Sequence, residues 1–175
     1  MEKLQSSIDI HFKNLEPLIS KWYTKLETAT HGVPPHITLL WPWISPPIGY
    51  SEIEILKNAV KNSKAFSITF DKIEYFQNGT IFLSCKDAKM IQNIMKKIFT
   101  AFPECKPYNG EFQNPTPHLT IAKVPDQTVF SEIYNEICTV LKPNLPLTCS
   151  IDEITIMKEL KTKNWEIVET VQLQK

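Results

Sequence analysis

The chain has 175 residues, and its 19 basic residues, all of them lysines, balance 19 acidic residues to a formal net charge of +0. This balance provides no broad positive surface for long double-stranded nucleic acid, so any nucleic acid partner must be short and bound locally. With 42% hydrophobic residues the length fits one globular domain and excludes disordered and fibrous classes.

Scarce glycine and scattered aspartate remove several cofactor classes. The four glycines are too widely separated to form a phosphate-binding P-loop or a dinucleotide-binding turn. The five aspartates form no cluster suited to magnesium, and the four cysteines show no C-x-x-C pairing, so we expect reduced thiols and no metal or cofactor. The N-terminal residues lack the apolar core of a signal peptide, and Pro42 interrupts the longest apolar stretch. We therefore expect a soluble, cytoplasmic protein with no membrane partner.

The first sixty residues predict two strands and two helices. Residues 8–12 alternate as a short strand, and Asn14 is placed to cap a helix whose apolar face ends at Leu26. After glycine and proline residues, positions 36–40 form an apolar strand. A proline-rich loop follows, and then Ser51 and Glu54 have the spacing of a capping box that opens a second helix.

A bulged strand, a hairpin and a third helix follow in the chain. Residues 66–75 alternate but slip by one position at 71–72, which indicates a bulge. Asn78 and Gly79 predict a tight turn into a strand at 80–85. An apolar stripe at helical spacing then extends to Phe102, where a proline ends it.

The second half repeats the first. Residues 117–121 match 35–39 at an offset of 82, Ser131 begins a match to the segment at Ser51 at an offset of 80, and 147–156 repeat the bulged strand at an offset of 81. A final strand is expected at 165–173. An internal duplication explains these offsets, and we expect a single α+β domain, 1–175, with pseudo-two-fold symmetry and a central cleft. Its lobes are expected at roughly 1–78 and 79–175, with possible strand exchange, in a monomer.

The repeated strand carries the chemistry. His36 and Thr38 point to one face of a strand, and His118 and Thr120 do the same in the second half. A single histidine in an apolar strand is more often structural than catalytic, but here two of the four histidines share one frame. Two imidazoles can divide the proton transfers of a phosphodiester displacement, and threonine hydroxyl groups can stabilise the charge on the phosphate oxygens. The other two histidines, His11 and His31, have no motif and are expected at the surface.

Paired H-x-T motifs about eighty residues apart resemble the 2H phosphoesterase superfamily. Within it, the segments 32–43 and 117–123 are similar to the 2′-5′ RNA ligase-like branch, and the order of elements matches over essentially the whole chain. The resemblance implies a bilobal α+β fold with His36 and His118 as acid and base and with Thr38 and Thr120 holding phosphate. It also implies a 2′,3′-cyclic phosphate or a 2′-5′-linked oligonucleotide as substrate. Members of that branch often have arginine at the position of Lys123, and lysine keeps the charge but loses the bidentate geometry.

Aromatic residues near the motifs are candidates for stacking on a nucleotide base: Trp41, Trp43, Tyr108 and Phe112. Because the side chains of Trp41 and Trp43 alternate, one of the two is expected in the core.

The leading hypothesis is a metal-independent phosphodiesterase acting on a small nucleotide or a short RNA. The alternatives are a non-catalytic nucleotide or RNA sensor, a 2′-5′ ligase working by the reverse reaction, and a purely structural role. The sequence leaves open the substrate and which histidine is the acid.

Overall fold

Two four-stranded antiparallel sheets form the centre of the computed structural model, which describes residues 3–175. Sheet 1 has the strand order β2-β1-β7-β8, with β1 at Ser6–His11, β2 at His36–Leu40, β7 at Glu153–Glu159 and β8 at Trp165–Gln172. Sheet 2 has the order β5-β4-β3-β6, with β3 at Phe66–Tyr75, β4 at Thr80–Cys85, β5 at His118–Lys123 and β6 at Leu147–Ile151. Together with the helices, these sheets give the α+β fold that the alternating patterns predict.

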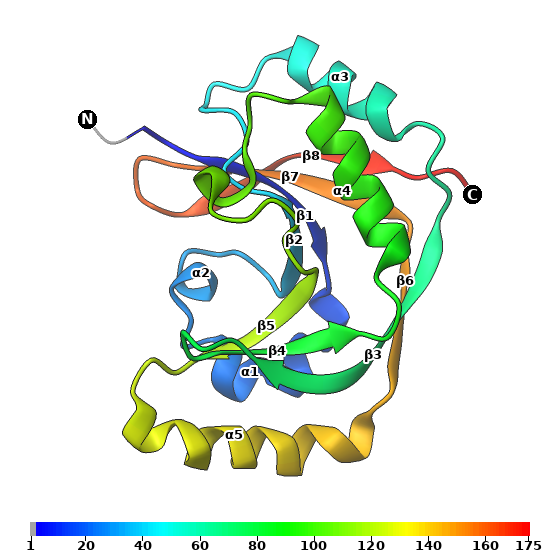
Figure 1. Ribbon diagram of the computed structural model, residues 1–175. Helices are drawn as coiled ribbons and strands as arrows, with labels where there is room; N and C mark the ends of the chain where they lie inside the picture. Colours follow the sequence, from blue (N-terminus) through cyan, green and yellow to red (C-terminus); the bar gives the residue numbers. More distant parts are fainter. Residues whose placement is uncertain (1–2) are drawn as a thin grey trace.

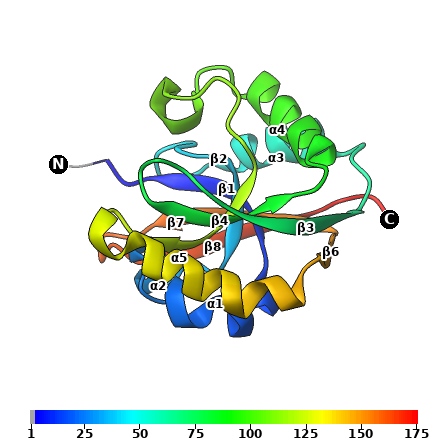
Figure 2. The same ribbon diagram turned by 60° about the horizontal axis from the view of Figure 1, so that its bottom comes forward.

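The helices lie outside the sheets. The α-helices are α1 (Glu16–Tyr23), α2 (Glu27–Thr30), α3 (Tyr50–Val60), α4 (Lys89–Ala101) and α5 (Gln127–Leu141). Short 3₁₀ turns are η1 (Lys13–Leu15), η2 (Pro107–Gly110) and η3 (Lys142–Asn144). Figures 1 and 2 show α3 beside α4 on one side of the sheets and α5 near α1 on the other. Helix α4 contacts β2 and helix α1 contacts β5, so a helix from the other half supports each motif strand.

Pseudo-two-fold symmetry is visible in the pairing of β3 with β6. Ile68 pairs with Cys149, which lies 81 positions later and is therefore its own counterpart in the repeat. On either side, Phe66 pairs with Ile151 and Phe70 pairs with Leu147. Such self-pairing of equivalent segments requires an approximate two-fold axis at the Ile68–Cys149 pair, as the duplication predicts.

The sheets do not divide the chain at residue 78. Sheet 1 contains β1 and β2 from the first half but β7 and β8 from the second, and sheet 2 includes β3 from the first half. The two copies of the bulged strand differ in whether they change sheet. Strand β3 passes a register shift between Phe70 and Lys72, and the second copy bends at Asp152, where the chain leaves sheet 2 as β6 and enters sheet 1 as β7. The predicted bulge at 71–72 is confirmed, and its copy is a change of sheet.

Two predicted helix caps are wrong. Asn14 lies inside η1, and α1 begins at Glu16 without a side-chain cap, because Pro17 in the first turn sets the start of the helix. Ser51 lies inside α3, whose N-cap is Gly49, and its hydroxyl group donates to Glu52 instead of accepting from a backbone amide as a cap would. The Asn78-Gly79 hairpin is confirmed: the Phe76 amide donates to the Thr80 carbonyl, and Gly79 has φ +84°.

No helix within residues 3–175 is long and apolar enough to cross a membrane.

Candidate active site

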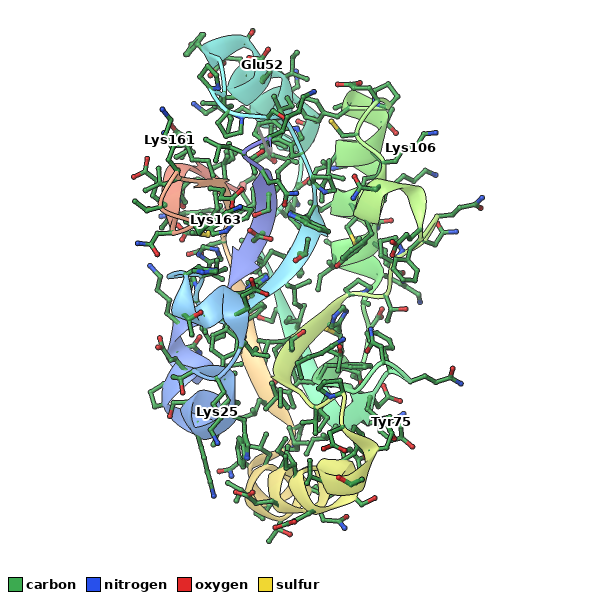
Figure 3. All side chains as sticks on the ribbon, turned by 90° about the vertical axis from the view of Figure 1, so that its left-hand side faces the viewer. Lys25, Glu52, Tyr75, Lys106, Lys161 and Lys163 are labelled. Atoms are coloured by element: carbon green, nitrogen blue, oxygen red, sulfur yellow. The ribbon has the colours of Figure 1, made fainter. Side chains whose placement is uncertain are left out.

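Strand alternation places both motifs on one face of their strands. Ile37 and Leu119 are fully buried, whereas the flanking His36, Thr38, His118 and Thr120 are half-exposed. Strands β2 and β5 contact each other across the two sheets. Figure 3 shows these strands side by side near the centre of the molecule, with the loop that follows the labelled Lys106 to one side. The structure therefore brings the four motif residues together.

Each motif histidine is held in the same way by its own backbone. Nδ1 of His36 lies 2.8 Å from the Pro34 carbonyl oxygen, and Nδ1 of His118 lies 2.8 Å from the Thr116 carbonyl oxygen. Because a carbonyl oxygen can only accept, each Nδ1 carries a proton and donates it. The remaining ring nitrogen, Nε2, is the one left for proton transfer in both residues.

A cavity of about 760 Å³ contains both motifs. His36, Thr38, His118 and Thr120 line it together with aromatic, amide and charged side chains from both halves. The predicted candidates Tyr108, Phe112 and Lys123 also belong to its wall. A cavity of this size, lined by a few convergent polar groups and several rings, has the character of a small-molecule site.

The second histidine has aromatic surroundings. The His118 ring lies edge-on to Phe76 and Phe82, with ring centroids 5.0 and 5.1 Å away. Burial lowers the pKa of His118, the nearby charge of His36 lowers it further, and the Thr116 carbonyl partly offsets the shift. These surroundings favour the neutral imidazole of His118.

The first motif has polar surroundings that motif reasoning missed. Asp9 on β1 stands opposite Thr38, and His11 stands opposite His36. Burial raises the pKa of Asp9, while the charge of His36 and hydrogen bonds with Ser7 and Thr38 oppose that shift. The alternation of polar and apolar residues from Ser7 to His11 is the signal that could have indicated a polar face on this strand.

The expectation of a surface position for His11 is wrong. Its ring is half-buried, and Nε2 is shielded from solvent without a hydrogen-bond partner among the described residues. Burial, followed by the charges of His36 and Lys13, lowers the pKa of His11 to about 4. His11 is therefore a neutral neighbour of the first motif near pH 7.

The η2 turn holds Tyr108 in an unusual backbone conformation. Tyr108 has φ 49° and ψ 43°, in the left-handed region that a bulky residue rarely adopts. Its amide donates to the Trp41 carbonyl oxygen at 2.6 Å, and its ring packs edge-on against Trp41 and Phe112. Such strain costs about 1–3 kcal/mol and is often found at ligand-binding segments. Burial raises the pKa of Tyr108, against the effect of a hydrogen bond with Thr38.

The two tryptophans have different positions. Trp43 is 6% exposed, packs edge-on against Phe102 and does not line the cavity of the motifs. Trp43 is thus the tryptophan that alternation places in the core, and Trp41 does not line this cavity either. Trp41 is half-buried, donates to Gln5 and supports the Tyr108 ring from behind.

Lys123 lies at the end of β5, where its ammonium group donates to the Thr80 hydroxyl at 3.0 Å. Two carboxylates, Glu27 and Glu111, also line the cavity. Within residues 3–175, no group of three or more His, Cys, Asp or Glu side chains is placed to hold a metal ion.

Comparison with known proteins identifies the family. A family model for the 2′-5′ RNA ligase superfamily matches residues 10–163. The chain belongs to this superfamily, that of the 2H phosphoesterases. No curated protein sequence matches the chain.

Solved structures share the fold of this 2H phosphoesterase. LigT of E. coli in complex with 3′-AMP has a TM-score of 0.66 and 13% identity, over 99% of this chain and 100% of that one. A structure described as a phosphoesterase has a TM-score of 0.67 and 12% identity, over 99% and 100%. The Thermus thermophilus protein TT0787 has a TM-score of 0.65 and 15% identity, over 97% and 98%. LigT has also been solved with ATP and with NADP+.

Proposed function

We propose that this 2H phosphoesterase is a phosphodiesterase that hydrolyses a 2′,3′-cyclic phosphate or a 2′-5′ linkage in a small nucleotide or short RNA by two-histidine catalysis. The observation that carries the proposal is the pair of imidazoles in one cavity, each with Nδ1 committed to its own backbone and Nε2 free. Family membership and the nucleotide complexes of LigT support it.

In the proposed reaction, an attacking water oxygen forms a bond to phosphorus while the bond to the leaving ribose oxygen breaks. Nε2 of one histidine takes the proton from the water, and Nε2 of the other gives a proton to the leaving oxygen. The neutral form that its surroundings favour suits His118 for the base, which leaves His36 to act as the acid. Thr120, Thr38 and Lys123 are candidates for contacting the other phosphate oxygens, where negative charge increases in the transition state.

The charges of the cavity favour a small substrate with few phosphate groups over a long one. Lys123 is its one lysine among the described residues, whereas Glu27 and Glu111 contribute two negative charges. A chain of phosphates would meet more repulsion than attraction here, because charges in a partly enclosed site are weakly screened. The rings of Tyr108 and Phe112 offer surfaces for a base.

A panel of 2′,3′-cyclic nucleotides, short 2′-5′-linked oligonucleotides and ADP-ribose cyclic phosphate, with products identified by mass spectrometry, tests the function. We expect hydrolysis of at least one compound, and a loss of about 10²–10⁴ in kcat/KM for His36→Ala or His118→Ala. Activity should be unchanged by EDTA, because side chains are assigned both proton transfers and the charge stabilisation.

Two results would contradict this function. Full turnover by the His36→Ala/His118→Ala double variant would remove the histidines from the mechanism. Binding of 3′-AMP without turnover of any compound in the panel would instead favour the sensor, and a purified product with a new 2′-5′ linkage would favour the ligase.

A further inference from the structure

An extra residue interrupts the second motif strand just after the motif. Phe82 stands opposite Thr120, whereas the preceding residue of β4 stands opposite Ala122, so β5 has one residue more than its partner here. Such a β-bulge shifts the alternation of faces by one position and can re-aim a side chain beside a functional site. Strict alternation from Thr120 would turn the side chain at position 123 away from the cavity. Because of the bulge, Lys123 lies in the cavity wall instead.

The first motif strand has the same extra residue. Thr38 and Leu40 stand opposite neighbouring residues of β1, so the residue between them has no partner of its own. At the repeat offset of 82, the position that corresponds to Lys123 is Trp41, whose ring packs against Tyr108 and does not line the cavity. The duplicated bulge thus presents an aromatic support in one half and a cation in the other.

A neutral hydroxyl group holds the ammonium group of Lys123. The ammonium group donates to the Thr80 hydroxyl at 3.0 Å, and the two residues stand opposite each other in the pairing of β4 with β5. Thr80 is 8% exposed, and its amide donates to the Asn78 side chain at 3.1 Å, so the acceptor is itself fixed. Glu27 and Glu111 line the same cavity, but within residues 3–175 no carboxylate forms an ion pair with Lys123.

A neutral acceptor positions a cation without neutralising it. A carboxylate partner would also hold the ammonium group, but it would cancel the charge that an anionic ligand meets. A lysine side chain has many rotamers, and immobilising it when a ligand binds costs affinity. Thr80 meets part of that cost in the free protein and leaves the full charge of Lys123 available to a phosphate oxygen.

We propose that Thr80 is a positioning residue of the phosphate site, which acts through Lys123 by holding its ammonium group at the cavity wall. The proposal rests on the function proposed above for the choice of a phosphate ligand. The hydrogen bond gives lysine a fixed direction, which a guanidinium group would have through its own rigid geometry.

A double-mutant cycle with 3′-AMP as the probe tests this inference, and its readout is binding measured by calorimetry. Thr80→Val keeps the β-branched shape and should weaken binding about fivefold, as expected when a long side chain must be immobilised by the ligand. In the Lys123→Met background the same change should weaken binding less than about twofold. Thr80→Ser, which keeps the hydroxyl group, should bind within about twofold of the wild type. The matched control is Thr69→Val, which lies outside the cavity and should leave binding unchanged.

Two results of this cycle would overturn the proposal. An equal loss in the wild-type and Lys123→Met backgrounds would show that the effect does not pass through Lys123. A loss in Thr80→Ser as large as that in Thr80→Val would show that the hydroxyl group is not responsible. Since 3′-AMP binding needs no turnover, failure of the substrate panel would leave this test intact.

Lysine acetylation followed by mass spectrometry provides a second measurement, which uses no nucleotide. Inorganic phosphate should slow the acetylation of Lys123, because a bound anion covers the ammonium group and favours its protonated form. The exposed Lys142 and Lys161, which do not line the cavity, are internal controls. Thr80→Val should reduce the protection of Lys123. Equal protection in the two proteins, or protection of Lys123 no greater than that of the control lysines, would overturn the proposal.

Discussion

Replacement of Gly79 by alanine should destabilise the protein strongly, because two independent constraints meet at this residue. Gly79 has φ +84°, and a Cβ placed there would lie 2.1 Å from the Val124 carbonyl oxygen and 2.6 Å from its carbon. The Val124 amide also donates to the Gly79 carbonyl at 2.8 Å, so the backbone segments cannot separate without loss of that hydrogen bond.

The magnitude follows from these two constraints. The left-handed conformation costs a residue with a side chain about 1–2 kcal/mol. Separation of the segments costs about 1 kcal/mol more for the lost hydrogen bond, and strain adds to it. We therefore expect the free energy of unfolding to fall by about 3 kcal/mol, a large part of the roughly 5–15 kcal/mol typical of a domain.

Gly110→Ala is the matched control. Gly110 has φ +90°, but its added Cβ would meet only the Lys106 side chain, at 3.5 Å. Only the conformational cost of about 1–2 kcal/mol is expected there. Both variants can be compared by urea denaturation followed by tryptophan fluorescence.

An equal loss of stability in the two variants would refute the reasoning, since the close approach of Val124 would then contribute nothing. A functional readout follows from the same geometry. Val124 follows Lys123, and Thr80 follows Gly79, so displacement of these segments should weaken the Lys123–Thr80 contact and raise KM in Gly79→Ala.

Two further predictions concern His11 on β1 and the two tryptophans. The lowered pKa of His11, about 4 against 6.5 when unfolded, means that the unfolded state binds the proton more tightly, so the free energy of unfolding should fall by up to about 3 kcal/mol as pH decreases from 6.5 to 4. His11→Asn should flatten this decrease in urea denaturation series at several pH values, and an unchanged slope would exclude His11 as the cause. The raised pKa of Asp9 makes the free energy of unfolding increase as pH decreases, and this contribution is the same in the wild type and in His11→Asn. Trp43→Ala should cost about 3–5 kcal/mol of stability, as is typical of buried aromatic truncations, whereas Trp41→Ala should cost less stability but reduce kcat/KM through Tyr108. Similar stability losses for both tryptophan variants would contradict their assigned positions.

Local rules in the sequence were sufficient for the motif strands. Alternation alone determines that His36 and Thr38 share a face, and the structure shows both at the cavity with Ile37 buried behind them. The hairpin at Gly79 was equally local, because the short turn between Phe76 and Thr80 depends on little beyond its own residues. Helix starts were less predictable, since several residues compete for the cap and a proline in the first turn decides the outcome in α1.

The other features of the site could not be predicted, because they depend on which strands pair and in which register. Asp9 and His11 are distant from the motif in sequence and reach it only because β1 pairs with β2 in one particular register. A shift of that register by one residue would turn both side chains to the opposite face. The aromatic surroundings of His118 depend in the same way on the pairing of β4 with β5.

The self-pairing of β3 and β6 has a consequence for the origin of this architecture. A half-length chain that pairs with a second copy of itself through the segment equivalent to residues 66–70 would form a closed, symmetric dimer, with one H-x-T strand supplied by each subunit. Both histidines of one cleft would then come from different molecules, and the site would exist only above the concentration at which the subunits associate. Joining the copies in one chain removes that dependence. It also frees each half to change separately, which is the condition for an aspartate to occupy one side and a phenylalanine the equivalent position on the other.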